Sequence, residues 1–146
     1  MKTEIIIGSD HGGYGLKEIL ITSLKEKGIA VEDAGCYNAE SVHYPVIAQK
    51  VVGAILANRF ERGILICGTG IGMSIAANRY NGIRAALCYD HYTARLAREH
   101  NNANVLVLGG RTTGDEIAKD ILDVWLHTEF QGGRHQIRVE MFDAKT

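Results

Sequence analysis

Cysteine and proline are scarce in this chain, and neither sign of charge is in excess. The 146 residues include one proline and three cysteines, Cys36, Cys67 and Cys88, with no C-x-x-C pair. A disulfide framework or a thiolate zinc site is therefore not expected, and a reducing compartment, the cytoplasm, is predicted. With 16 basic and 17 acidic residues the net charge is −1. That balance gives no electrostatic basis for nucleic acid or an anionic membrane as a partner.

Long hydrophobic runs are missing as well. The N-terminal stretch MKTEIIIGSDHGG has an apolar run of only three residues before Gly8. Such a run is not typical of a signal peptide, and no other stretch approaches the length of a membrane span. The hydrophobic fraction of 46% and the charged fraction of 23% are typical of a soluble globular protein. A chain of this length buries roughly two thirds of its unfolded surface, so we expect one domain, residues 1–146.

What the sequence does contain is a series of short apolar runs that alternate with amphipathic segments. Runs typical of buried strands lie at 4–8, 29–32, 63–67, 83–88 and 104–108. Segments with helical spacing follow each of them, and a last charged helix is expected after Gly132 and Gly133. Five strands alternating with helices predict a parallel sheet that is covered on both faces. The predicted fold is therefore α/β, a three-layer αβα, Rossmann-like sandwich with right-handed crossovers.

The most informative strand end is the one at Cys67, which is followed directly by the glycine loop, residues 68–72. Ligands of open parallel sheets bind beyond the carboxyl ends of the strands, a rule that also selects 9–11, 90–91 and 110–111. Three glycines in five residues let the backbone approach a ligand closely and leave N–H groups free. A helix that begins there favours a phosphate or an enediolate. Cys67 is then a candidate reactive thiol, although a small buried residue that closes a strand is the alternative.

Dinucleotide binding is a rival interpretation of the glycine loop. Asp90 follows at a suitable distance, but the motif requires G-x-G-x-x-G, and position 73 is methionine. The motif also usually follows the first strand, whereas this loop follows the third. We therefore expect no dinucleotide cofactor. No set of His, Asp and Glu residues has the spacing of metal ligands, so no metal is expected either.

Two further groups of polar residues suit a phosphorylated ligand. Asp10 and His11 end the first predicted strand, where Asp10 could accept a sugar hydroxyl and His11 could meet a phosphate or a ring oxygen. The alternative is a turn in which Asp10 caps the helix. Arg134 and Arg138 are four residues apart and share a helix face, so their guanidinium groups could clamp a phosphate. An ordinary solvated helix is the alternative for this pair.

His100 is placed differently from the other candidates. It follows the fourth predicted helix and precedes the fifth strand, which places it at the amino ends of the strands, across the sheet from Cys67. Within one subunit it should not reach the glycine loop. If His100 is catalytic, it serves the site of a neighbour across a dimer interface. The alternative is a histidine that interacts with the helix macrodipole.

Taken together, four segments resemble the ribose-5-phosphate isomerase B family, which also includes the galactose-6-phosphate isomerase subunits. The segments are 8–13, 66–72, 98–105 and 132–138; they span nearly the whole chain in the order of the family. Each is weak alone, but the set is specific. The resemblance implies an αβα fold, a phosphorylated monosaccharide as substrate and no cofactor. It also implies a homodimer or a dimer of dimers, with each site shared between subunits.

The same resemblance implies roles for individual residues. Cys67 matches the base that moves the C2 proton, His100 the acid that opens the furanose ring, and Thr69 a residue that orients the ring or the enediolate. Some relatives use a glutamate just after the third glycine as the base. This chain has Met73 there, so the resemblance leaves Cys67 as the only candidate base. Positions that match contacts to the sugar or its phosphate are Asp10, His11, Gly68, Gly70, Ile71, Gly72, Asn101, Arg111, Arg134 and Arg138.

One position departs from the family pattern. Many ribose-5-phosphate members have an acidic residue before the Tyr-Pro pair, where this chain has His43 followed by Tyr44 and Pro45. Some galactose-6-phosphate subunits also carry His there, so His43 and Tyr44 are candidate specificity residues. The galactose enzymes consist of two unlike subunits, and the Arg134/Arg138 pair is similar to the ribose branch. We therefore predict interconversion of ribose 5-phosphate and ribulose 5-phosphate; a hexose 6-phosphate isomerase (allose or galactose type) and a non-catalytic module that binds sugar phosphates or nucleotides are the alternatives.

Overall fold

Strands and helices alternate along residues 4–127, and one further helix follows. The computed structural model describes residues 4–143, so the ends of the predicted domain, 1–3 and 144–146, lie outside it. The elements are β1 (Glu4–Ser9), α1 (Tyr14–Glu26), β2 (Ala30–Asp33), α2 (Tyr44–Leu56), β3 (Arg62–Cys67), α3 (Ile71–Ala77), β4 (Ala85–Leu87), α4 (His91–Glu99), β5 (Val105–Gly109), α5 (Asp115–His127) and α6 (Arg134–Glu140). None of these helices is long and apolar enough to cross a membrane.

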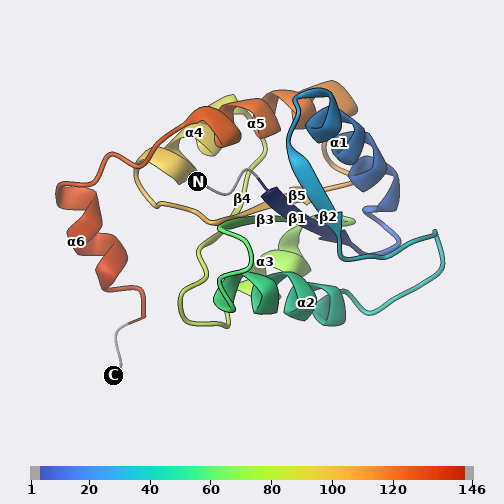
Figure 1. Cartoon of the computed structure of the whole chain (residues 1–146), viewed down its shortest axis with the longest axis horizontal. Coiled ribbons are helices and arrows are strands. Elements are labelled where there is room, and N and C mark those ends of the chain that lie inside the picture. The colour runs from blue at the N-terminus through green and yellow to red at the C-terminus, as the bar shows by residue number, and fades with distance from the viewer. Residues whose placement is uncertain (1–3, 144–146) are drawn as a thin grey trace.

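The strands form one parallel sheet in the order β2-β1-β3-β5-β4. Helices α1, α4 and α5 cover one face of the sheet, and α2 and α3 cover the other (Figure 1). The predicted three-layer αβα fold is confirmed. Because β2 lies on one side of β1 and β3 on the other, the strand order reverses between β1 and β3. Ligands of such sheets bind in the crevice at this reversal, beyond the carboxyl ends of the two strands.

Alternate side chains of the central strand pack into two separate cores. Ile64 and Ile66 of β3 lie among the residues under α1, α4 and α5, whereas Leu65 and Cys67 lie under α2 and α3. Ile64, Leu65 and Ile66 are fully buried, and burial of each such side chain stabilises the fold by roughly 1.5–3 kcal/mol. Two-sided burial explains why the strands read as continuous apolar runs.

The fourth strand is shorter than the predicted run 83–88. Only Ala85–Leu87 pairs with β5. The Arg84 N–H donates to the side chain of Asn104 at 2.8 Å, and the Ile83 N–H closes a turn onto the Tyr80 carbonyl at 3.2 Å. Ile83 is buried and Arg84 is half-buried, but neither belongs to the strand. The apolar run in the sequence therefore predicts a longer strand than the structure contains.

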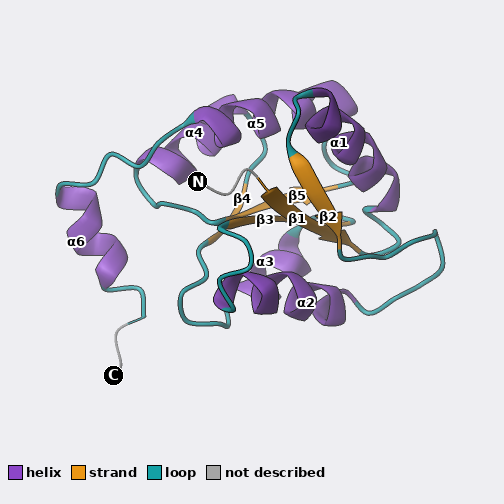
Figure 2. Cartoon of the chain, viewed as in Figure 1, coloured by secondary structure: helices purple, strands orange, loops and turns teal. Residues whose placement is uncertain are grey.

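Helix α6 stands apart from the three layers (Figures 1 and 2). The chain reaches it through Gly132 and Gly133, both with positive φ (67° and 57°), a conformation that glycine adopts without the strain imposed by a Cβ. The segment is held by the Gln131 N–H, which donates to the Glu99 carbonyl at 3.0 Å. The last helix therefore projects from the end of α4 instead of packing on the sheet.

Candidate active site

The β1–α1 turn is built around the carboxylate of Asp10. Its Oδ1 accepts the N–H groups of Gly12 at 2.9 Å and Gly13 at 3.2 Å, and only 7% of the residue is exposed. The turn considered as the alternative for Asp10 is present, but Asp10 does not cap the helix, because the N-cap residue of α1 is Gly13. The second carboxylate oxygen, Oδ2, accepts no hydrogen bond from the described residues, because both N–H groups of the turn donate to Oδ1.

Glycines allow three turns to meet at this edge of the sheet. A Cβ on Gly110 would lie 2.5 Å from the Gly12 carbonyl oxygen, and a Cβ on Gly13 would lie 2.6 Å from that of Ile66. Any side chain at either position would force the turns apart. A Cβ on Gly68 would lie 3.3 Å from Nη1 of Arg111. The guanidinium of Arg111 therefore lies beside the start of the glycine loop.

Cys67 ends β3 inside this group of turns. The Gly70 N–H donates to its Sγ at 3.2 Å, and the Ile71 N–H donates to Oγ1 of Thr69 at 3.2 Å. Gly70 has a φ of 81°, which favours glycine. Within residues 4–143 the N–H groups of Gly68 and Thr69 have no acceptor. The loop thus places one sulfur and two unused backbone donors at the carboxyl end of the central strand.

A second cysteine, Cys88, lies just after β4 at the same edge of the sheet. Burial raises the pKa of the Cys88 thiol to about 11; a hydrogen bond with Thr93 lowers it and the charge of Asp90 raises it further. Such a thiol is neutral at ordinary pH and cannot serve as a base. Asp90 caps α4 by accepting the Thr93 N–H at 2.8 Å, which accounts for this strand end without a ligand. His91 is exposed on α4 near Asp120.

The loop between β2 and α2 closes over His11. The Val42 N–H donates to Nδ1 of His11 at 3.3 Å, which requires Nδ1 to be unprotonated, so in the neutral ring the proton lies on Nε2. His11 therefore offers an N–H donor on its other side. A Cβ on Gly72 would lie 2.6 Å from Cζ of Tyr44, so the Tyr44 ring packs against the glycine loop. His43, next to it, is the exposed N-cap residue of α2.

The remaining candidates lie at the opposite edge of the sheet. His100 follows α4, and β5 separates it from Gly109, which pairs with Cys67. Five residues of strand span about 16 Å at about 3.3 Å per residue, farther than an imidazole can reach. Exposed on the same side are Asn101 and, on α6, Arg134 and Arg138. The structure therefore groups Asp10, His11, Tyr44, residues 67–72 and Arg111 at one edge, and His100, Asn101, Arg134 and Arg138 at the other.

The turn next to the second group is held by Arg98, a residue that the sequence reasoning missed. Arg98 is 5% exposed. Its guanidinium donates to the Ala103 carbonyl at 2.7 Å, the Thr128 carbonyl at 3.2 Å and Oδ1 of Asn102 at 3.1 Å. Asn102 has a φ of 48°, which a non-glycine residue rarely adopts. The sequence did contain one signal for this residue, because Arg98 follows the buried positions Ala94 and Ala97 of the same helix. An arginine on the buried face of a helix must have its donors satisfied by hydrogen bonds.

Helix α6 is docked by its histidine. The rings of His100 and His135 stack with centroids 4.1 Å apart. Burial, and then the positive neighbours His100, Arg134 and Arg138, lower the pKa of His135, while Glu99 raises it. The stack therefore holds α6, with its two arginines, near His100.

This docking should weaken as the pH falls. The pKa of His135 is lower in the folded than in the unfolded chain, so its contribution to stability is complete above the unfolded value of 6.5 and is lost as the pH falls below it. We expect the melting temperature to decrease between about pH 7.5 and about pH 5.5, and to decrease less in His135→Phe, which keeps the stack. His127→Gln, on an exposed histidine, serves as the control. Equal pH dependence in wild type and His135→Phe would contradict this account.

Two cavities lie away from Cys67. A cavity of about 530 Å³ lies at the amino ends of the central strands, lined by Arg62, Arg84 and Arg98 among others, and one of about 400 Å³ includes Asn101. Neither contains a residue of the glycine loop. Within the described ranges, no group of three His, Cys, Asp or Glu residues lies close enough to hold a metal.

Comparisons with known proteins agree with this arrangement. A model of the family described as Ribose/Galactose Isomerase matches residues 5–142. The chain belongs to the ribose/galactose isomerase family. Ribose-5-phosphate isomerase B of Escherichia coli is 47% identical, over 97% of this chain and 95% of its own. D-erythrulose-4-phosphate isomerase of Pectobacterium atrosepticum is 46% identical, over 93% of this chain and 90% of its own.

Solved structures of the family have the same fold. The crystal structure of a ribose 5-phosphate isomerase from Thermotoga maritima superposes with a TM-score of 0.95, at 58% identity over 96% of this chain and 97% of its own. Membership in the ribose/galactose isomerase family confirms the resemblance that the four segments indicated. None of these three relatives carries a name that supports the dinucleotide-binding interpretation of the glycine loop.

Proposed function

We propose that this chain is a single-domain, cytoplasmic isomerase that interconverts ribose 5-phosphate and ribulose 5-phosphate without a cofactor. The observation that carries the proposal is the position of Cys67, with its Sγ held by the Gly70 N–H at 3.2 Å beside two unused N–H groups. A proton acceptor next to free backbone donors is what an enediolate intermediate requires. The names of the E. coli and T. maritima relatives support the pentose substrate.

The chemistry follows from these groups. The thiolate of Cys67 takes the proton from C2 of the open-chain aldose and returns it to C1. One proton also moves from the hydroxyl on C2 to the oxygen on C1, so the reaction is balanced without an oxidant. The N–H groups of Gly68 and Thr69 stabilise the negative charge that develops on these oxygens, as an oxyanion hole does. Asp10 and the Nε2–H of His11 hold sugar hydroxyls, and Arg111 attracts the phosphate.

Ring opening needs an acid, and we propose that His100 of a second subunit provides it. In one chain, His100 lies across the sheet from Cys67, together with Arg134 and Arg138. A homodimer with two-fold symmetry would place both groups at each site, because each subunit would give one group and receive the other. Arg134 and Arg138 of the partner would then bind the phosphate together with Arg111.

Exposed apolar side chains support this assembly. On α3, directly after the glycine loop, Ile71 is 52% and Ile75 is 61% exposed; at the end of α6, Met141 is 66% exposed. Clusters of this kind next to polar site residues are typical of protein interfaces. We propose that α3 of one subunit packs near α6 of the other. A further association of two dimers is compatible with the same chain.

The test is an isomerase assay with ribose 5-phosphate, allose 6-phosphate, galactose 6-phosphate and erythrulose 4-phosphate, side by side. We expect the highest kcat/KM with ribose 5-phosphate. Faster turnover of a hexose phosphate would keep the isomerase and assign His43 to a different sugar. Faster turnover of erythrulose 4-phosphate would follow the P. atrosepticum relative. Binding of ribose 5-phosphate without turnover of any sugar would contradict the proposal and favour a binding module.

A further inference from the structure

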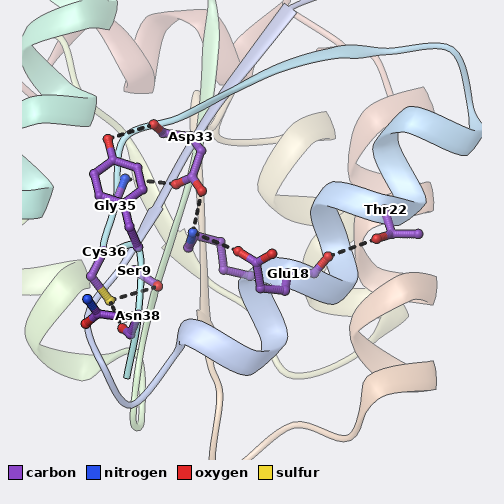
Figure 3. A network of polar contacts seen from close by, with 9 residues as sticks. Ser9, Glu18, Thr22, Asp33, Gly35, Cys36 and Asn38 are labelled. Atoms are coloured by element: carbon purple, nitrogen blue, oxygen red, sulfur yellow. Dashed lines mark hydrogen bonds and ion pairs between the residues drawn. The ribbon is translucent and has the colours of Figure 1, made fainter. Parts of the chain in front are cut away.

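A lysine that the isomerase chemistry does not use is completely buried beside the site. Lys17 lies on α1, four residues after Gly13, and its side chain has no exposed surface. Its Nζ is 2.6 Å from Oδ2 of Asp33 and 3.2 Å from Oε1 of Glu18 (Figure 3). Lysine is almost never fully buried unless it is paired. The ion pair with Asp33 is therefore a fixed part of this edge of the sheet.

Asp33 transmits this fixed position to the loop that follows β2. Its other oxygen, Oδ1, accepts the Gly35 N–H at 2.8 Å (Figure 3). The Gly35 carbonyl accepts the Ser9 N–H, and the Cys36 N–H donates to the Ser9 carbonyl, both at 2.6 Å. Ser9 directly precedes Asp10 and His11. The Lys17–Asp33 pair thus joins the start of the loop to the turn that carries two site residues.

The far end of the same loop reaches the site as well. The Val42 N–H donates to Nδ1 of His11 at 3.3 Å, and the next two residues are His43 and Tyr44. Tyr44 packs against Gly72 of the glycine loop. Residues 34–43, which we call the sugar loop, are therefore held at one end by Asp33 and at the other by His11. A shift of the loop backbone next to Asp33 would therefore alter the position of His43, the last residue of the loop, and of Tyr44, which follows it.

Two tyrosines surround the same ammonium group. The ring centroids of Tyr14 and Tyr37 are 5.2 Å and 5.9 Å from Nζ of Lys17. Tyr37 belongs to the sugar loop, and its hydroxyl donates to the Asp33 carbonyl at 3.2 Å. A cation between two aromatic rings is attracted to both. The charge of Lys17 therefore holds the loop through Tyr37 in addition to Asp33.

We propose that Lys17 is a positioning residue that sets the geometry of the sugar loop, and with it the length of sugar phosphate that the site turns over. The inference rests on the proposed isomerase function. Lys17 itself touches no substrate; it acts through Asp33 and the loop. The consequence concerns orientation of the sugar, because a misplacement of about 1 Å at a reacting centre can cost about 10²-fold in rate.

The primary variant is Lys17→Met, which keeps the length of the stem and removes the charge. We expect kcat/KM for ribose 5-phosphate to fall about tenfold, mainly through kcat. We also expect the preference for ribose 5-phosphate over erythrulose 4-phosphate and allose 6-phosphate to shrink. Lys17→Arg, which keeps a cation, should recover part of both. Hydrogen exchange should rise at the amides of residues 34–43 and remain unchanged in β3 and β5.

Two control variants separate positioning from simple loss of stability. Glu18→Gln removes the other carboxylate, which is half exposed, and should leave kcat/KM and the substrate preference unchanged. Leu24→Ala cuts a fully buried side chain at the far end of the same helix. It should lower the melting temperature while the substrate preference at 25 °C stays that of wild type. The same change of preference in Leu24→Ala as in Lys17→Met would overturn the proposal.

The charge pair provides a second route if Lys17→Met folds poorly. Asp33→Asn alone removes the shorter of the two ion pairs of a buried cation and leaves only the half-exposed Glu18, which is destabilising. The double variant Lys17→Met/Asp33→Asn is neutral, so it should melt higher than Asp33→Asn alone. It should still show the reduced preference for ribose 5-phosphate. A double variant with wild-type preference would overturn the proposal.

Wild type measured in the same assay keeps this inference separate from the proposed function. If wild type turns over none of the sugars, the isomerase proposal fails, and the positioning role fails with it. If wild type turns over ribose 5-phosphate and Lys17→Met matches it in kcat, KM and preference, only the role of Lys17 is overturned. Reduced preference in Lys17→Met with unchanged preference in both controls supports it.

Discussion

Replacement of Cys67 by alanine should lower kcat with ribose 5-phosphate by at least about 10²-fold and leave KM almost unchanged. The thiol is the proton acceptor in the proposed reaction, and a positioned acid or base contributes about 10²–10⁴ in rate. Binding should persist because the phosphate and the hydroxyls are held by other side chains. The measurement is steady-state kinetics of wild type and Cys67→Ala, with the isomerisation followed in each direction.

A matched control uses the other cysteine at the same edge of the sheet. Cys88→Ala removes a thiol whose pKa of about 11 keeps it neutral. Its kcat should therefore stay within about a factor of two of the wild-type value. Exchange of the C2 proton with solvent should disappear in Cys67→Ala and persist in Cys88→Ala. Wild-type turnover in Cys67→Ala would rule out Cys67 as the base.

Replacement of His100 by asparagine should lower kcat for the cyclic sugar nearly as much as Cys67→Ala does. It should lower kcat only slightly for a sugar that is already in the open-chain form. The proposed role of His100 is to protonate the ring oxygen, a step that an open-chain substrate does not need. We expect kcat with ribose 5-phosphate to fall about 10²-fold. The reverse reaction starts from ribulose 5-phosphate, which has no furanose form, so the exchange of its C1 proton with solvent should be retained to a much greater extent.

The comparison with His135 tests whether the effect belongs to the imidazole of His100 or to the docking of α6. His135→Phe keeps a ring stacked on His100 at the position seen in the structure, 4.1 Å between centroids. Its kcat should remain close to that of wild type near neutral pH. An equal loss with cyclic and open-chain substrates in His100→Asn would contradict the role in ring opening.

The fold and half of the site could be predicted from the sequence because both follow local rules. The central strands β1, β3 and β5 are buried on both faces, which makes their apolar runs easy to recognise. The residues at the carboxyl ends of β1 and β3 follow from the polarity of parallel strands. Cys67 and the glycine loop are adjacent in the chain, so no knowledge of tertiary contacts was needed to group them.

Other features depend on contacts between distant segments and were out of reach. The Lys17–Asp33 pair joins residues 16 positions apart, and an isolated lysine in a helix gives no sign that it is buried. Arg98 similarly binds the Thr128 carbonyl, 30 positions away. The sequence also could not show that His11 accepts from the Val42 N–H, since that bond depends on how the loop folds back. The shared site was inferred from the opposite positions of His100 and Cys67 along the strands and from the family resemblance.

The central claim, that each site needs Cys67 of one subunit and His100 of the other, is tested most directly by mixing two inactive variants. Cys67→Ala and His100→Asn would be unfolded together, refolded and compared with each variant refolded alone. A hybrid dimer contains one site with both residues intact, so random pairing should restore about one quarter of wild-type activity. If the mixture remains as inactive as its two components although hybrid dimers have formed, the shared site is contradicted.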